Sequence, residues 1–141
     1  MRFMVMVKAN DETEAGVLPT EAEIRDMMRF NEELVKAGVM LAGDGLHPSS
    51  RGARVSFSGT RRTVVDGPFT EAKELIAGFW IWQCKSLDEA IEWAKRCPNP
   101  NGAGGELEIR QVFEADDFGD AMTADLREAD QRMRAQTGQP H

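Results

Sequence analysis

The amino-acid sequence predicts an α+β fold, a ferredoxin-like sandwich in which helices cover one face of a sheet. The first observation behind this prediction is the order of hydrophobic patterns, which reads β-α-β-β-β-β-α-β up to Phe113. The second is a pair of capping boxes, in which Thr20 precedes Glu23 and Ser86 precedes Glu89 by three residues. Two βαβ-like halves with antiparallel pairing satisfy both observations.

Six segments have the composition of strands. The first is apolar at nearly every position, as expected for a strand that is covered on both faces. The third alternates Val55 and Phe57 with polar residues, which indicates a half-exposed strand, and residues 58–60 connect it to the fourth as a hairpin. The six strands are expected at residues 2–9, 39–46, 53–58, 61–65, 75–84 and 106–113.

Two helices are expected between these strands. The first begins at Thr20 after an acidic loop at residues 10–19, and Gly38 ends it because glycine adopts the left-handed conformation readily. The second begins at Ser86 and stops before Pro98. The apolar stripes that face the sheet are expected to comprise Ile24, Met27, Met28, Leu34 and Val35 in the first helix and Leu87, Ala90, Ile91, Ala94 and Cys97 in the second.

The strand at residues 75–84 predicts a dimer. Its Phe79 and Ile81 point to one face of the sheet and its Trp80 and Trp82 to the other, so one pair lies on the face without helices. A sheet face with exposed aromatic residues promotes aggregation unless something covers it. We therefore expect a homodimer in which a second subunit covers this face.

The composition restricts the class of protein. A chain of 141 residues fits one domain, residues 1–115, followed by an extension, residues 116–141, which is partly helical over 121–135 and ends in a tail expected to be disordered. The net charge of −7 argues against nucleic acid as a partner, because such binding needs Lys and Arg to neutralise phosphates. Neither a signal peptide nor a membrane-spanning segment is recognised. We therefore expect a cytoplasmic protein with reduced, buried thiols at Cys84 and Cys97.

The segment from Asp66 to Glu74, with the sequence DGPFTEAKE, concentrates the chemistry of the chain. It combines a rigid Gly-Pro turn with four charged side chains directly before the apolar strand at residues 75–84. Ionisable groups are therefore expected at the edge of the core, where a ligand or a partner could contact them.

This segment, followed by Gly78-Phe79 in a strand and by Leu87-Asp88-Glu89-Ala90, resembles the YCII-related proteins that carry the DGPF domain. The resemblance covers about residues 1–115 and implies a dimeric α/β barrel built from ferredoxin-like halves. The family is essentially uncharacterised, and a cleft with acidic and histidine groups implies an enzymatic role. Some relatives are encoded beside, or fused to, extracytoplasmic-function sigma factors, which implies a regulatory connection.

The chain departs from this family in one respect. Shorter YCII-type relatives are thought to use a histidine on or near the first helix together with an aspartate, whereas the helix expected at residues 21–37 contains no histidine. That pair of residues therefore cannot be transferred to this chain.

Asp66 and His47 are the candidate catalytic residues. Asp66 is either a general base or a structural clamp whose carboxylate accepts backbone N–H bonds in the Gly-Pro turn. His47 follows a predicted strand in a loop, where it is either a proton-transfer group or an ordinary loop residue.

Several charged residues are candidates for substrate binding. Glu71, Lys73 and Glu74 either line a cleft or form a solvated turn with weak local ion pairs. Arg51, Arg54, Arg61 and Arg62 stand in a stretch without acidic residues, which either attracts an anionic substrate or protects the edge of a hairpin from aggregation. The candidates for orienting an anion are Arg54, Arg62 and Arg110.

The expected function is that of a small cytoplasmic protein with a cleft near the DGPF motif that binds, or also transforms, a small polar or anionic molecule. The alternative is a non-enzymatic interaction or regulatory module, connected with extracytoplasmic-function sigma factors, in which the DGPF segment is architectural. Two cysteines thirteen residues apart and two histidines, one of them terminal, provide no ligand cluster, so we expect neither a metal nor a cofactor.

Overall fold

The computed structural model describes residues 1–99 and 104–138, which form two compact units, Met1–Gln111 and Val112–His141. Residues 100–103, which precede the last expected strand, and residues 139–141 of the expected tail therefore lie outside the described residues. Among the described residues, no helix is both long enough and apolar enough to cross a membrane.

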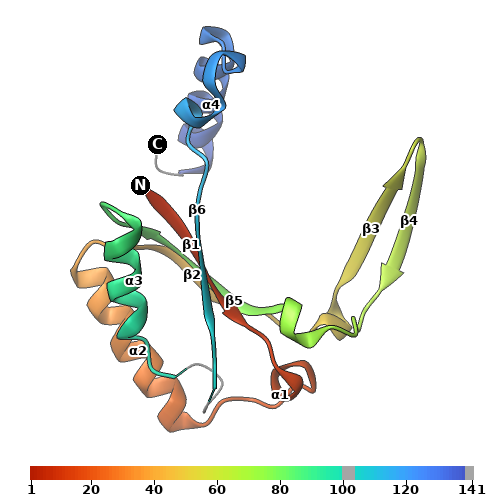
Figure 1. Ribbon diagram of the computed structural model, residues 1–141, viewed down its shortest axis with the longest axis vertical. Coiled ribbons are helices and arrows are strands. Elements are labelled where there is room, and N and C mark those ends of the chain that lie inside the picture. The colour runs from red at the N-terminus through yellow and green to blue at the C-terminus, as the bar shows by residue number, and fades with distance from the viewer. Residues whose placement is uncertain (100–103, 139–141) are drawn as a thin grey trace. The chain divides into compact units, whose positions relative to one another are not determined.

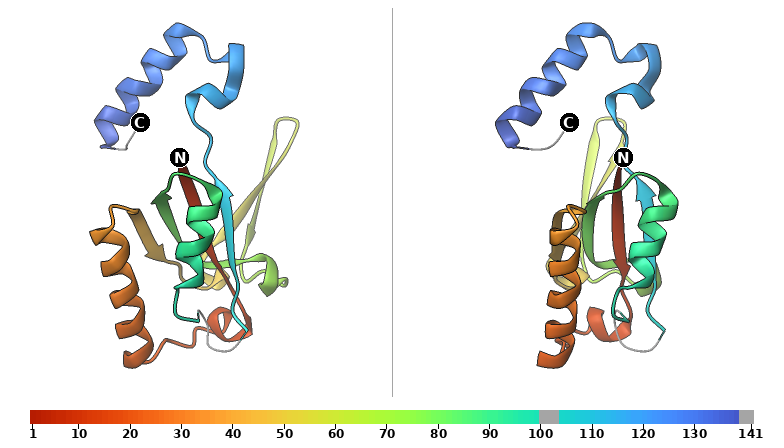
Figure 2. Two further views of the ribbon diagram at one scale, coloured as in Figure 1. Left: turned by 60° about the vertical axis from the view of Figure 1, so that its left-hand side comes forward. Right: turned by 90° about the vertical axis from the view of Figure 1, so that its left-hand side faces the viewer.

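The first unit is built on a four-stranded antiparallel sheet with the order β2-β5-β1-β6. Two helices, α2 and α3, cover one face of this sheet (Figures 1 and 2). This is the predicted ferredoxin-like α+β arrangement. Its elements are β1 (Arg2–Lys8), α2 (Glu21–Lys36), β2 (Met40–Gly45), β5 (Ile76–Gln83), α3 (Leu87–Lys95) and β6 (Leu107–Gln111).

A separate hairpin is inserted between β2 and β5. Its strands, β3 (Ala53–Ser58) and β4 (Arg61–Asp66), pair only with each other and form a second, two-stranded sheet. The hairpin extends away from the four-stranded sheet of its own unit (Figure 1). Two short helical turns flank it, η1 (Ser49–Arg51) before β3 and η2 (Ala72–Glu74) after β4.

The core lies between the sheet and the two helices. Trp80 and Trp82 of β5 point to this side and are buried against Phe30 and Leu34 of α2. The indole Nε1 of Trp80 donates a hydrogen bond to Asn31 Oδ1 at 2.9 Å, which satisfies its polar group. It is therefore the other pair of β5 side chains, Phe79 and Ile81, that belongs to the face without helices.

The expected apolar stripe of the first helix is partly wrong. Phe30, which the prediction omitted, and Leu34 are the buried residues of α2, whereas Ile24, Met28 and Val35 are exposed. At 100° per residue, those three side chains lie on the side of α2 adjacent to the one that contacts the sheet. The helix thus carries more apolar surface than the sheet can cover.

Two local predictions also need correction. The expected acidic loop contains the short helix α1 (Asp11–Glu14), because Asn10 and Thr13 cap its start reciprocally. At the second helix, Ser86 Oγ accepts a hydrogen bond from Glu89 N, but the Glu89 carboxylate accepts from the N–H of Lys85 instead of that of Ser86.

The second unit contains η3 (Ala115–Ala121) and α4 (Ala124–Thr137). The rings of Phe113 and Phe118 stack with their centroids 5.0 Å apart. Gly138 ends α4 with a φ of 71°, the left-handed conformation that glycine adopts without strain. The helix therefore begins and ends slightly later than the expected 121–135.

The packing of α2 predicts unequal effects of two neighbouring truncations. Leu34 is completely buried and Val35 is 60% exposed. We expect Leu34→Ala to lower the free energy of unfolding by about 2–5 kcal/mol, because it leaves a cavity in the core. Val35→Ala should stay within about 0.5 kcal/mol of the parent protein. Urea denaturation followed by tryptophan fluorescence measures both, and equal losses would contradict the assigned orientation of α2.

Candidate functional site

The DGPF segment forms a corner at which the hairpin returns to the four-stranded sheet. The N–H of Gly67 donates to the carbonyl oxygen of Gly52 at 3.0 Å, and the N–H of Phe69 donates to Ser49 Oγ at 2.9 Å. The Gly67–Pro68 peptide bond is cis. The turn after β4 is therefore attached to the segment that precedes β3.

Ser49 is in turn held by Glu14 of α1. The N–H of Ser49 donates to Glu14 Oε1 at 3.0 Å, and its hydroxyl donates to Glu14 Oε2. A carboxylate that accepts two such bonds is a strong anchor, because charge-assisted hydrogen bonds are stronger than neutral ones. One hydroxyl thus joins three segments that are distant in the sequence, with a donor bond to Glu14 and an acceptor bond from Phe69. We call Glu14, Ser49 and the Asp66–Phe69 turn the DGPF corner.

Gly67 is required at this corner by the space available. A Cβ atom at position 67 would lie 1.7 Å from the carbonyl oxygen of Ser49 and 2.6 Å from its carbonyl carbon. Both are backbone atoms, which cannot move aside like the end of a flexible side chain. The absence of a side chain at Gly67 is therefore what lets the turn approach the Ser49 backbone.

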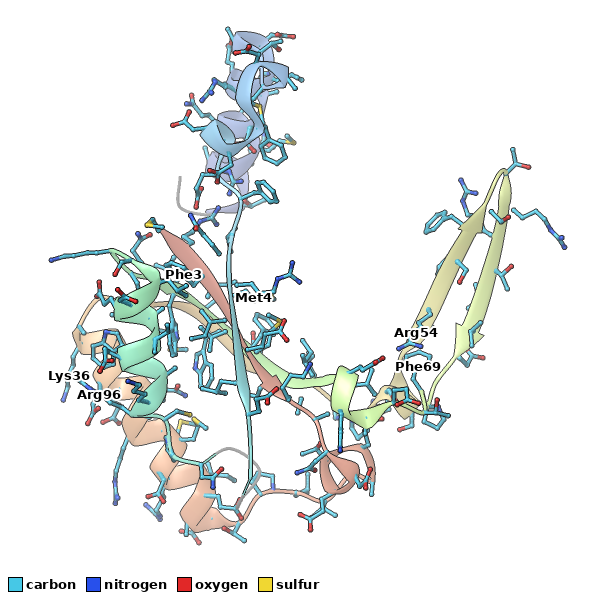
Figure 3. The ribbon with its side chains drawn as sticks, viewed as in Figure 1. Phe3, Met4, Lys36, Arg54, Phe69 and Arg96 are labelled. Carbon is cyan, nitrogen blue, oxygen red and sulfur yellow. The ribbon has the colours of Figure 1, made fainter. Side chains whose placement is uncertain are left out.

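Cationic side chains surround the foot of the hairpin. The guanidinium carbon of Arg54 lies 3.8 Å from the centroid of the Phe69 ring, and Figure 3 shows the two side chains together where β3 begins. Nη1 of Arg51 lies 3.2 Å from Nε2 and 3.4 Å from Nδ1 of His47. Within the described residues, neither arginine forms an ion pair with a carboxylate. The foot of the hairpin thus presents two guanidinium groups that have no carboxylate partner among the described residues.

Asp66 is the last residue of β4 and is exposed. In the part of the chain that the structure describes, its carboxylate accepts no hydrogen bond and contacts no cation. Of the two alternatives for Asp66, the structural clamp is therefore not observed among the described residues, since the side chain that accepts the N–H bond belongs to Ser49. No hydrogen bond between described residues joins Asp66 to His47.

The remaining predicted site residues are dispersed. Arg62 lies near the tip of the hairpin, where Nη1 donates to the carbonyl oxygens of Gly59 and Arg61, both at 3.0 Å. Arg110 of β6 stands opposite Met4 in the main sheet. The charged residues after the turn are exposed, and none of them forms an ion pair among the described residues; they are Glu71, Lys73 and Glu74.

Sequence reasoning missed Glu14 and Ser49. Ser49 lies between two expected strands and Glu14 lies in the expected acidic loop, and neither is a candidate site residue there. Their hydrogen bonds span 35 residues of sequence, so no local spacing relates them. The one local signal is Asn10, whose cap on α1 fixes the element that carries Glu14.

The structure contains no reactive nucleophile of the thiol type at this corner. Cys84 and Cys97 are free cysteines outside it, and burial raises the pKa of each to about 11. Both are therefore protonated at neutral pH and poorly nucleophilic. Among the described residues, no group of three His, Cys, Asp or Glu side chains is placed to hold a metal ion.

Comparison with known proteins shows the family. The YCII-related domain matches residues 1–116 of the chain. An uncharacterised protein of Rhizobium meliloti (strain 1021) is 34% identical over 106 residues, which cover 73% of this chain and 86% of that protein. The chain therefore belongs to the YCII-related family, as its DGPF segment predicts.

One similar solved structure is 5-chloro-2-hydroxyhydroquinone dehydrochlorinase (TftG) from Burkholderia phenoliruptrix AC1100, in complex with 2,5-dihydroxybenzoquinone. The match covers 81% of this chain and 96% of that chain, with 18% sequence identity and a TM-score of 0.41. The two chains thus superpose only in part.

The hydrogen bonds of the Ser49 hydroxyl predict that replacing Ser49 lowers the free energy of unfolding more than replacing the adjacent Ser50. Ser49→Ala removes the acceptor of the Phe69 N–H and the donor to Glu14, so we expect a loss of about 1–3 kcal/mol in the free energy of unfolding. Ser50→Ala changes an exposed neighbour and should stay within about 0.5 kcal/mol. Chemical denaturation measures both variants, and a neutral Ser49→Ala would contradict the role of this hydroxyl.

The close approach at Gly67 predicts a contrast between two glycines. Gly67→Ala should lower the free energy of unfolding by about 3 kcal/mol or more, because its Cβ overlaps the Ser49 backbone. At Gly45, at the end of β2, a Cβ meets nothing within 4 Å. Gly45→Ala should therefore be neutral or slightly stabilising. If thermal unfolding shows equal midpoints for the two variants, the close approach is not present in solution.

Proposed function

We propose that the protein binds a small anionic molecule at the foot of its hairpin, beside the DGPF corner. The proposal rests mainly on the position of two exposed guanidinium groups, those of Arg51 and Arg54. Both guanidinium groups stand next to a turn that Ser49 holds in place, and neither is neutralised by a carboxylate among the described residues. In a chain with a net charge of −7, two neighbouring guanidinium groups without a carboxylate partner favour an anionic ligand.

The chemistry of the two arginines supports this class of ligand. A guanidinium presents planar N–H donors that match the oxygens of a carboxylate or a phosphate. Arg54 rests on the Phe69 ring, which limits its orientations and leaves the N–H groups at its edge available to a ligand. Because the corner fixes Phe69, less rotational freedom of Arg54 is lost on binding.

Asp66 and His47 are the groups that we propose for proton transfer with such a ligand. A carboxylate and an imidazole are both suited to general acid–base chemistry, and both side chains are exposed beside these guanidinium groups. Glu71, Lys73 and Glu74 would contact the polar parts of the ligand from the turn η2. Arg62 and Arg110 are not part of this proposed site, because they lie near the hairpin tip and on the main sheet.

Self-association is part of the same proposal. Met4 and Met6 of β1 stand opposite Ile81 and Phe79 of β5 on the sheet face that α2 and α3 do not cover. A second copy that packs on this face would bury these apolar side chains, which gives the expected homodimer. The two free cysteines fit a reducing compartment, so we place the protein in the cytoplasm.

Binding of small anions tests the proposed site. Isothermal titration calorimetry with inorganic phosphate, oxalate and benzoate screens the two kinds of oxygen anion. For whichever probe binds, the double variant Arg51→Gln, Arg54→Gln should weaken binding at least about tenfold, or about 1.4 kcal/mol. Arg25→Gln on α2 removes an exposed arginine from another element and should leave the affinity unchanged.

The variant Asp66→Asn tests the role of the Asp66 carboxylate by the same calorimetry. Because its carboxylate holds no described contact, we expect the melting temperature to remain unchanged while binding or turnover of the ligand changes. If Arg110→Gln abolishes binding and the Arg51, Arg54 variant does not, the site lies on the open sheet face. That result, or the absence of binding by every probe, would contradict the proposal and favour the interaction module.

A further inference from the structure

Among the described residues of its own unit, the hairpin β3–β4 is contacted mainly at its foot, where Arg54 lies over the Phe69 ring. All twelve residues of its two strands are exposed, and the strands pair only with each other. An isolated two-stranded ribbon in water is at best marginally stable, because it has no hydrophobic layer to pack against. A hairpin that projects from the sheet in this way (Figure 1) is therefore expected to find a partner surface.

The exposed side chains of this hairpin include large apolar groups. On one face, Val55 stands opposite Val64, and Phe57 follows two residues along β3. Their exposed fractions are 50%, 64% and 71%. On the other face Val65 is 49% exposed, so neither face is protected. Contiguous apolar surface of this kind marks an interaction site.

The hairpin also differs in charge from the rest of the chain. The hairpin, residues 53–66, contains three arginines and one acidic residue, Asp66, a net charge of +2, whereas the remaining residues contain 14 basic and 23 acidic side chains, a net charge of −9. The described structure shows no ion pair for Arg51, Arg54, Arg61 or Arg62. A cationic, apolar ribbon thus projects from a chain whose other surface is strongly acidic.

We propose that the hairpin β3–β4 is a dimerisation arm that lies against a second copy of the chain. Charge complementarity identifies the occupant, because a ribbon of net charge +2 is matched by the remainder of an identical chain, which has a net charge of −9. In a twofold dimer each copy would donate one arm and receive one, so the contact occurs twice. A polyanionic nucleic acid is disfavoured, since the remainder of the chain would repel it.

The contact has two physical components. The apolar residues Val55, Phe57 and Val64 lose water on docking, which supplies affinity. Arg61 and Arg62, the arginines of the arm that lie outside the proposed anion site, attract the acidic surface and are screened by salt, so they supply orientation and salt dependence. The arm extends the self-association proposed above and does not depend on anion binding at the DGPF corner.

A double charge insertion on the arm tests this inference. Phe57→Glu with Val64→Glu places two carboxylates on the apolar face of the hairpin, toward an acidic partner. Val17→Glu with Leu18→Glu is the matched control, because it makes the same change at residues that are 59% and 84% exposed in the segment between α1 and α2. Circular dichroism and thermal unfolding of each variant verify that the main sheet remains folded.

Sedimentation equilibrium of the full chain at 50 mM and 500 mM NaCl gives the dimer dissociation constant. We expect a dimer whose dissociation constant rises about a hundredfold or more in the arm variant and by less than about threefold in the control. The parent dimer should also weaken at the higher salt concentration.

Two results would overturn the inference. One is an arm variant that dimerises like the parent protein; if Met6→Glu then separates the subunits, the dimer rests on the open sheet face alone. The other is a parent protein that is monomeric at every concentration. This result would overturn the inference also if the monomer binds an anionic oligonucleotide through the hairpin. Failure of the proposed anion site is a separate result. It is measured by calorimetry of the arm variant with an anion that binds the parent protein, because Arg51 and Arg54 are unchanged in this variant.

Discussion

The hydrogen bonds of the Ser49 side chain are the constraint on which the DGPF corner depends. This hydroxyl accepts from the Phe69 N–H and donates to the Glu14 carboxylate, so the turn after β4, the loop before β3 and the helix α1 meet at one atom. The close approach of Gly67 to the Ser49 backbone brings the two chains near enough for these bonds. Without this junction, the foot of the hairpin would have only the ladder of β3 and β4 and the Gly67–Gly52 bond to define its direction.

The DGPF corner and the hydrophobic core have separate roles in the molecule. The buried indoles of Trp80 and Trp82 stabilise the sheet against α2, at a distance along β5 from the turn that precedes this strand. The exposed cations stand on the other side of the turn, outside that core. Substitutions of these cations can therefore change binding without a large change in the free energy of unfolding. In the same way, the hairpin can dock on a partner without any rearrangement of the main sheet.

The fold was predictable because its signals are local. The alternation of β5 and the caps at Thr20 and Ser86 are read from a few neighbouring residues, and they place the sheet and both helices correctly. The side of α2 that faces the sheet was harder, because the helix is apolar over more than one side and only packing selects Phe30 and Leu34. The contacts of the candidate site were not predictable, since Glu14, Ser49 and Phe69 are related by tertiary structure alone. The DGPF motif located the corner in the sequence, but the side chain that holds the turn is that of Ser49, which lies outside the motif.

Amide hydrogen exchange of Phe69 tests the central claim most directly. Its N–H is hydrogen-bonded to Ser49 Oγ in a turn that has no strand partner, so only the corner can protect it. We predict exchange slowed by an opening free energy of about 2 kcal/mol or more, with the protection lost in Ser49→Ala while the amides of β5 remain protected. Exchange of the Phe69 amide at the rate of an unfolded chain in the parent protein, beside a protected β5, would contradict it.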